Sequence, residues 1–278
     1  MAEAGQRAGT FGGIDPGPRG AAAAGYWDAR AEGFARSQDA DDGVLVGCVL
    51  SRVARHADLA GARVLDVGAG AGRYGLAMAA AAEHVTLTDV SPGMLAAAAE
   101  RAAARGLANV DLVRADWAAA DLAGLGWAGA FDLVFASMVP ALREPAALDK
   151  LAAASRGLVA VNQITRDGDD VAGHIRDVLG LADHPDPHND PAFVSDVVRH
   201  LAARGVGCVV EEPETIVERG YAFEDLLARY AGRFEEAARR AGTGLREVLE
   251  PLRSRHGELI PVRRHTRTGL IIFRGEAG

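Results

Sequence analysis

The chain has 278 residues, of which 49% are hydrophobic, and a formal net charge of −8. This length and hydrophobic content predict one sizeable folded domain, with room for a helical insertion. An acidic chain lacks the basic surface of a nucleic-acid-binding protein, so the composition favours a small-molecule substrate and no nucleic-acid partner.

The cysteine and hydropathy patterns argue against three further classes of protein: disulfide-rich, zinc-binding and membrane-spanning. Two cysteines, Cys48 and Cys208, make neither a disulfide framework nor a zinc cluster, so we expect two buried thiols. The sequence has no run of 18 apolar residues and no charged segment followed by an apolar core at its start. We therefore expect a cytoplasmic protein with no membrane partner.

The N-terminal part is predicted to differ in structure from the remainder of the chain. Residues 1–20 are rich in Gly, Ala and Pro, which predicts a disordered tail. Residues 21–60 predict helices, and the first of them carries Tyr26 and Trp27. We expect the main domain to cover residues 61–278.

A strand, a glycine loop and a helix open this domain. Residues 64–67 predict a short buried strand, because three of them are apolar and the fourth is Asp66. Three glycines at alternate positions follow it in the run Gly68-Ala69-Gly70-Ala71-Gly72, and residues 73–82 predict a helix. This order is that of the nucleotide-binding first unit of an α/β sheet.

The details of the loop narrow the choice of ligand. A dinucleotide fingerprint would place its third glycine at the position of Arg73, but the third glycine comes one residue earlier, at Gly72. Asp66 at the loop entry would disfavour an anionic pyrophosphate and suit a ligand with a cationic end. S-adenosyl-L-methionine (SAM) has such an end, with an ammonium and a sulfonium group.

At residues 65–72 the sequence resembles the first motif of the class I SAM-dependent methyltransferases of the small-molecule type. The resemblance implies a Rossmann-like sheet of seven mostly parallel strands, the last one antiparallel, with helices on both faces and SAM as the cofactor. It places part of SAM against Asp66, Gly68, Ala69, Gly70 and Gly72. The N-terminal helices would cover the site, and Tyr26 or Trp27 is either part of this cover or an ordinary packing aromatic.

A second strand, residues 84–88, ends at Asp89, which lies 23 residues after Asp66. An acidic residue about 20 positions further on is placed to accept hydrogen bonds from both ribose hydroxyls. Ser91 then caps a predicted helix that has Pro92 at its first position. The resemblance implies that Val90 and Met94 pack against the adenine ring.

A third strand, residues 110–114, leads to Asp116 and Trp117. The resemblance implies that Asp116 accepts a hydrogen bond from the adenine amine and that Trp117 stacks on the ring. Trp117 as a core residue is the alternative.

The fourth strand, residues 131–135, leads to Ser137, where the resemblance places the transferable methyl group. Methyltransferases that act on nucleobases or glutamine carry an Asn/Asp-Pro-Pro-aromatic motif here. This chain has Ser137-Met138-Val139-Pro140 instead, which argues against amide or exocyclic amine substrates. The fifth strand, residues 158–162, is apolar up to Asn162, as expected for a central parallel strand.

Beyond Asn162 we expect helical insertions near residues 166–190 and 222–257. The first includes a loop, residues 183–190, with two histidines and three aspartates. Its prolines prevent a helix that would place both imidazole rings on one face, so we expect a surface loop and no metal site. Residues 206–217 predict the sixth strand and residues 268–273 the last one.

Methyl transfer from SAM to a small-molecule acceptor, by an SN2 reaction, is the leading functional hypothesis. Asn162, His174, Tyr221 and His188 are candidate catalytic residues. A second hypothesis is cyclisation of SAM with release of methylthioadenosine, as in azetidine-2-carboxylate synthases, and a third is a non-catalytic SAM-binding protein. The sequence identifies neither the acceptor nor the oligomeric state, for which a homodimer is one option.

Overall fold

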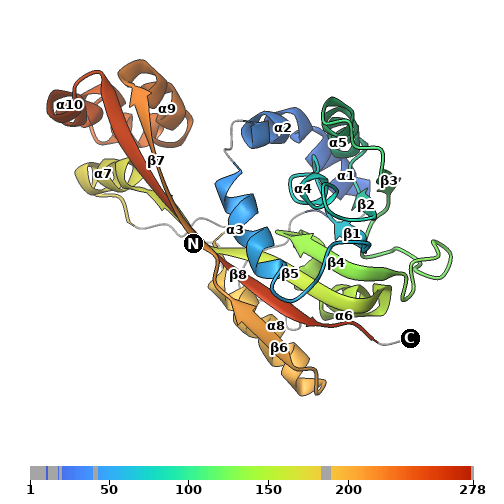
Figure 1. Ribbon diagram of the computed structural model, residues 1–278. Helices are drawn as coiled ribbons and strands as arrows, with labels where there is room; N and C mark the ends of the chain where they lie inside the picture. The colour runs from blue at the N-terminus through green and yellow to red at the C-terminus, as the bar shows by residue number, and fades with distance from the viewer. Residues whose placement is uncertain (1–10, 12–17, 19–20, 40–42, 183–188, 277–278) are drawn as a thin grey trace. The chain divides into compact units, whose positions relative to one another are not determined.

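The computed structural model describes residues 11, 18, 21–39, 43–182 and 189–276. The chain divides into two compact units, which are described separately (Figure 1). The first unit comprises Met1–Thr165, Asp190–Pro213 and Thr268–Gly278, and the second comprises Arg166–Asn189 and Glu214–Arg267. Two of the four boundaries between the units fall inside strands β5 (Ser155–Asp169) and β8 (Leu259–Arg274), and the other two follow Asn189 and Pro213.

A mixed sheet of eight strands has the order β3-β2-β1-β4-β5-β8-β6, and β7 pairs with β8 outside this path. The strands are β1 (Arg63–Val67), β2 (His84–Asp89), β3 (Val110–Arg114), β4 (Phe131–Ser137), β5 (Ser155–Asp169), β6 (Cys208–Glu211), β7 (Glu214–Ala222) and β8 (Leu259–Arg274). Strands β1 to β5 pair in parallel, and β8 runs antiparallel to β6 and β7. The predicted Rossmann-like fold with an antiparallel last strand is confirmed.

Helices cover both faces of the sheet in the first unit, because its central strands are apolar on both faces. On β4, Leu133 and Phe135 join one core cluster and Val134 joins the other. The first cluster includes residues of α3 (Val44–Val53), α4 (Gly75–Met78) and α5 (Pro92–Ala104). The second includes residues of α6 (Pro145–Ala154) and α8 (Pro191–Ala203).

Two N-terminal helices, α1 (Ala21–Asp28) and α2 (Ala31–Asp39), lie beside α5 (Figure 1). The disordered tail predicted for residues 1–20 lies outside the described residues except at Phe11 and Pro18. Phe11 is buried, and its backbone N–H donates to the carbonyl oxygen of Arg143 over 2.8 Å. Arg143 belongs to a short 3-10 helix, η1 (Pro140–Arg143), that follows β4.

The second unit consists of α7 (Asp170–Leu179), α9 (Phe223–Arg240), α10 (Leu245–His256), β7 and the adjoining parts of β5 and β8. It has its own hydrophobic core, which includes Ile175, Leu226, Tyr230, Phe234 and Leu249. In the part of the chain that the structure describes, no helix is long and apolar enough to cross a membrane.

The structure corrects four element boundaries. The sixth strand, predicted at residues 206–217, is two strands, β6 and β7, with Pro213 between them, because proline has no N–H for the ladder. The last strand begins nine residues earlier than predicted, at Leu259 rather than residue 268. The helix predicted at residues 73–82 is only the four residues of α4, because the glycine loop continues to Tyr74. Strand β5 extends to Asp169, whose side chain then caps α7.

Candidate functional site

The glycine loop follows β1 at the carboxyl edge of the parallel strands. Gly68, Gly70 and Gly72 have φ angles of 64°, 55° and 80°, in the left-handed region that favours glycine. A Cβ atom at Gly68 would lie 2.7 Å from Cγ2 of Val139, so the loop backbone approaches the turn after β4. All three positions therefore favour glycine by their backbone conformation, and at Gly68 and Gly72 a Cβ atom would also meet a neighbouring side chain at 2.7 Å.

Hydrogen bonds from two other elements hold the loop. The backbone N–H of Ala69 donates to the carbonyl oxygen of Thr88 on β2 over 3.0 Å. The Arg101 guanidinium, from α5, donates to the carbonyl oxygen of Ala71 over 2.8 Å. Both bonds fix backbone groups of the loop. Patterns of side chains in the sequence do not predict such bonds.

Asp66 is only 2% exposed, and its Oδ2 accepts a hydrogen bond from the Gly75 N–H over 2.8 Å. Burial raises the pKa of Asp66 to about 8, and the nearby charge of Asp89 also raises it, whereas the Gly75 N–H acts in the opposite direction. Most Asp66 side chains are therefore protonated at neutral pH. The carboxyl group joins the end of β1 to the start of α4, and it can ionise when a cation arrives.

This raised pKa predicts how stability changes with pH. Between about pH 4 and pH 8 the folded chain holds a proton on Asp66 that the unfolded chain releases, so the free energy of unfolding falls as pH rises. The slope from this group is at most about 1.4 kcal/mol per pH unit. Urea unfolding at pH 5, 6, 7 and 8 should show a smaller fall for Asp66→Asn than for the wild type, and equal falls would contradict the prediction.

Asp89 lies at the end of β2 beside the glycine loop. Its Oδ2 accepts a hydrogen bond from the Gly70 N–H, and its Oδ1 accepts one from the Ser91 N–H, each over 2.9 Å. Burial raises the pKa of Asp89, and the two N–H groups oppose that shift. The carboxylate thus connects the glycine loop to the start of α5.

Ser91 caps α5 as predicted, since its Oγ accepts a hydrogen bond from the Met94 N–H over 3.0 Å. Met94 is buried, and a Cβ atom at Gly70 would lie 3.8 Å from its sulfur atom. Val90 is half-buried, and its carbonyl oxygen accepts a hydrogen bond from Nε of Arg114 over 3.3 Å. The structure therefore places Met94 against the loop and Val90 next to Asp89.

Asp28 is a residue that the sequence analysis missed. Its Oδ1 accepts hydrogen bonds from the Ser91 hydroxyl over 2.5 Å and from the Gly93 N–H over 2.9 Å. These bonds lower the pKa of Asp28 and attach the end of α1 to the start of α5. No local pattern predicts the contact, because 63 residues separate Asp28 from Ser91.

Asp116 and Trp117 occupy different environments after β3. Asp116 is half-buried, and its Oδ1 accepts a hydrogen bond from the Ala118 N–H over 3.1 Å. Trp117 is only 4% exposed, and its indole N–H donates to the carbonyl oxygen of Ala147 on α6 over 2.9 Å. The position of Trp117 corresponds to the core alternative.

The turn after β4 contains a backbone outlier. Met138 has a φ of 58°, the one positive value among non-glycine residues of the described chain. Its N–H donates to the carbonyl oxygen of Asn162 over 3.0 Å, and its sulfur accepts from the Ile164 N–H over 3.2 Å. Such strain, on the order of 1 kcal/mol, occurs often at functional sites.

Ser137 and Asn162 face each other across the parallel pair of β4 and β5. Nδ2 of Asn162 donates to the Ser137 hydroxyl oxygen over 3.0 Å. Oδ1 of Asn162 is buried and has no hydrogen-bond partner within the described residues. The strand ends thus bring together a hydroxyl, an amide and an unused acceptor beside the glycine loop.

The other candidate residues belong to α1, to the second unit or to a segment outside the described residues. The Tyr26 ring is 39% exposed on α1, with the Arg30 guanidinium 3.6 Å from its centroid. His174 and Tyr221 belong to the second unit, where His174 contacts the carbonyl oxygen of Val248 and Arg229 lies over the Tyr221 ring. His188 lies outside the described residues.

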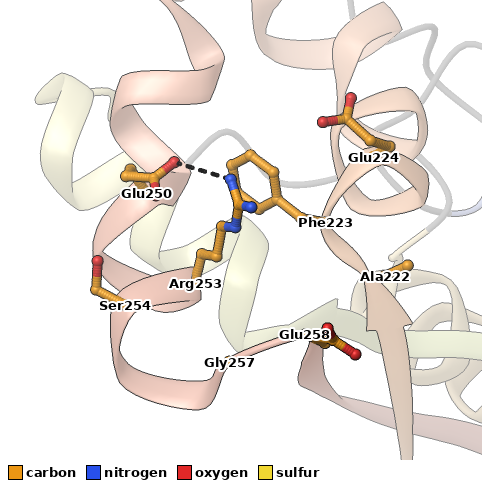
Figure 2. Close-up of a pocket in the computed structure, with 8 residues that line it drawn as sticks. All are labelled: Ala222, Phe223, Glu224, Glu250, Arg253, Ser254, Gly257 and Glu258. Carbon is orange, nitrogen blue, oxygen red and sulfur yellow. Dashed lines mark ion pairs between the residues drawn. The ribbon is translucent and has the colours of Figure 1, made fainter.

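The second unit also has a hollow of about 460 Å³ (Figure 2). Arg253 lies over the Phe223 ring, with 5.0 Å between Cζ and the centroid, and forms an ion pair with Glu250 over 3.9 Å. The lining residues are Ala222, Phe223, Glu224, Glu250, Arg253, Ser254, Gly257 and Glu258. None of the predicted site residues is among them.

Known proteins share this architecture. Residues 64–160 match the family model of a methyltransferase domain. The chain is similar to the YcgJ protein from Bacillus subtilis, with 17% identity and a TM-score of 0.50 over 82% of this chain and 98% of that one. It is also similar to a proposed methyltransferase from Bacillus halodurans, with 15% identity and a TM-score of 0.50 over 81% and 97% of the two chains. No curated protein matches the sequence.

At these identities the two structures show the fold, and the family model assigns the segment that contains the glycine loop, Asp89 and Asp116. Residues 64–160 of this chain are therefore similar to a methyltransferase domain, and the chain shares the fold of these two structures.

Proposed function

We propose that this protein transfers the methyl group of SAM to a small-molecule acceptor. The observation that carries the proposal is the Asp89 carboxylate, which bonds to the Gly70 N–H and lies at the end of the strand next to the glycine loop. A half-buried carboxylate beside left-handed glycines suits a ribose with two neighbouring hydroxyl donors. The acidic net charge supports an acceptor that is not a nucleic acid.

The residues at the strand ends fit SAM by their chemistry. Asp89 would accept from the ribose hydroxyls, Asp116 from the adenine amine, and Met94 offers an apolar surface for the ring. The glycine loop leaves its backbone open to the methionine part, and Asp66 behind it can ionise to balance the positive charge. The unused Oδ1 of Asn162 can accept a hydrogen bond from an N–H or O–H group that enters the site.

When bound, SAM supplies an electrophilic methyl group on a sulfonium ion. The protein then needs to exclude water and to hold the acceptor's nucleophilic atom in line with the methyl carbon and the sulfur. The strained turn at Met138 and the Ser137–Asn162 pair lie at the strand ends where this alignment would occur. The nucleophile loses its proton to solvent or to a base as the product forms.

Mass spectrometry of the purified protein tests the proposal. The protein is incubated with SAM alone and then with amine, hydroxyl, thiol and carboxyl acceptors, and Asp89→Ala serves as the inactive control. S-adenosylhomocysteine (SAH) that appears only with an acceptor, and not with the control, is the expected result. Methylthioadenosine above the spontaneous background without an acceptor would contradict methyl transfer and indicate cyclisation of SAM.

A further inference from the structure

Lys150, on α6, is the only lysine among the 30 lysine and arginine residues of the chain. Every other cationic position is an arginine, so this sequence uses a compact ammonium group at one place only. An ammonium has three donors that rotate about a flexible stem, whereas a guanidinium presents its donors in a rigid plane. The use of lysine here indicates a geometry that a planar cation does not satisfy.

The contacts of Lys150 show this geometry. Its Nζ donates to the carbonyl oxygens of Trp117, Ala118 and Ala120, over 3.0, 2.9 and 2.8 Å. Each of the three donors therefore has one carbonyl partner. In the part of the chain that the structure describes, no carboxylate lies within ion-pair distance of this ammonium. Its hydrogen bonds thus all go to one backbone turn, and it also lies 5.9 Å from the centroid of the Trp117 ring.

This turn carries Asp116. The backbone carbonyl of Asp116 accepts a hydrogen bond from the Ala119 N–H over 3.0 Å, and its Oδ1 accepts from the Ala118 N–H over 3.1 Å. One turn earlier on α6, the carbonyl oxygen of Ala147 accepts from the Trp117 indole. Helix α6 therefore holds the residues after Asp116 in two ways. The Lys150 ammonium binds three of their backbone carbonyls, and the carbonyl of Ala147 binds the Trp117 side chain.

We propose that Lys150 is a positioning residue of the cofactor site, which fixes the turn so that the Asp116 carboxylate meets the 6-amino group of adenine. This inference rests on the proposed function, because it requires adenine at Asp116. Three carbonyl dipoles that point at one place repel each other without a cation between them. When the ammonium is removed, the turn opens and the Asp116 carboxylate loses its fixed position.

Calorimetric binding of two ligands tests this role. One ligand is SAH, and the other is its analogue with purine in place of adenine, which lacks only the 6-amino group. In the wild type, the ratio of the two dissociation constants measures the hydrogen bond at Asp116. We expect Lys150→Met to weaken the binding of SAH about tenfold and the binding of the analogue less than twofold. The preference for SAH, expressed as the ratio of the two dissociation constants, should therefore be largely lost.

Matched variants separate position from charge and from folding. Lys150→Arg keeps the charge, but its donors lie in one plane and cannot reproduce the arrangement of the three ammonium donors, so its ratio should also fall. Asp116→Ala should lower the ratio as Lys150→Met does, and the double variant should show no further loss. Arg199→Met removes an exposed cation from α8, where Arg199 pairs only locally with Asp196, and should leave the ratio unchanged.

The outcomes distinguish the two proposals. If Lys150→Met and Lys150→Arg keep the wild-type ratio, or weaken both ligands equally, the positioning role is wrong while SAM binding stands. If the wild type binds neither ligand, the proposed function fails, and the role of Lys150 fails with it.

Discussion

Replacement of Asp89 by alanine should raise the dissociation constant for SAH at least about 100-fold, because two hydrogen bonds to a charged acceptor contribute about 3 kcal/mol or more together. The substitution also frees the N–H groups of Gly70 and Ser91, which the carboxylate holds in the folded chain. Isothermal titration calorimetry of the purified variant with SAH measures the change directly.

Asp111→Ala is the matched control for this experiment. Asp111 lies on the neighbouring strand β3, its side chain is 67% exposed, and it pairs with His84 on the surface. We expect its dissociation constant for SAH to stay within about twofold of the wild type, as is usual for exposed pairs. A change of less than tenfold for a well-folded Asp89→Ala variant would contradict the assignment of Asp89 to the ribose.

The second large effect is expected at Gly75, on stability rather than on binding. A Cβ atom at Gly75 would lie 2.0 Å from Cδ2 of Leu87 and 2.8 Å from Oδ2 of Asp66. Both neighbours are buried in the centre of the sheet and have little room to move. Gly75→Ala should therefore lower the free energy of unfolding by about 3 kcal/mol, and the melting temperature by about 6–12 °C. Urea and thermal unfolding followed by circular dichroism measure both quantities.

Gly47→Ala provides the opposite case with the same chemical change. Gly47 lies in α3, it is exposed, and a Cβ atom there would meet nothing within 4 Å. Alanine is the better helix former, so the variant should gain up to about 1 kcal/mol. Equal stabilities for Gly75→Ala and Gly47→Ala would show that the core around Leu87 adapts, contrary to the prediction.

The sequence predicts the parts of the site that depend on local pattern. The glycine loop, Ser91 as a cap, and Asp89 at a strand end each follow from residue types within a few positions of one another. The environment of Trp117 does not, because its partner Ala147 lies 30 residues away. The link from Asp28 to α5 is missed for the same reason.

Strand β7 illustrates a different limit. Its exposed residues alternate strictly with buried or half-buried ones, but Ile216 is exposed and Thr215 is buried, so hydropathy gives little strand signal. Its pairing with β8 is supported instead by charged side chains: Glu214 on β7 pairs with His265 and Arg267 on β8. These partners are more than 50 residues apart in the chain. Periodicity within a short window cannot detect cross-strand pairs of this kind.

The place of β8 in the sheet bears on how the chain folds during synthesis. β8 is made after every other strand of this sheet, yet it lies between β5 and β6. Until it emerges, β5 has an unpaired edge and β6 has no partner strand. Such edges pair readily with other chains, so nascent or C-terminally truncated forms are exposed to aggregation. The sheet is therefore completed only after β8 has been made, and until then β5 and β6 are open to pairing with other chains.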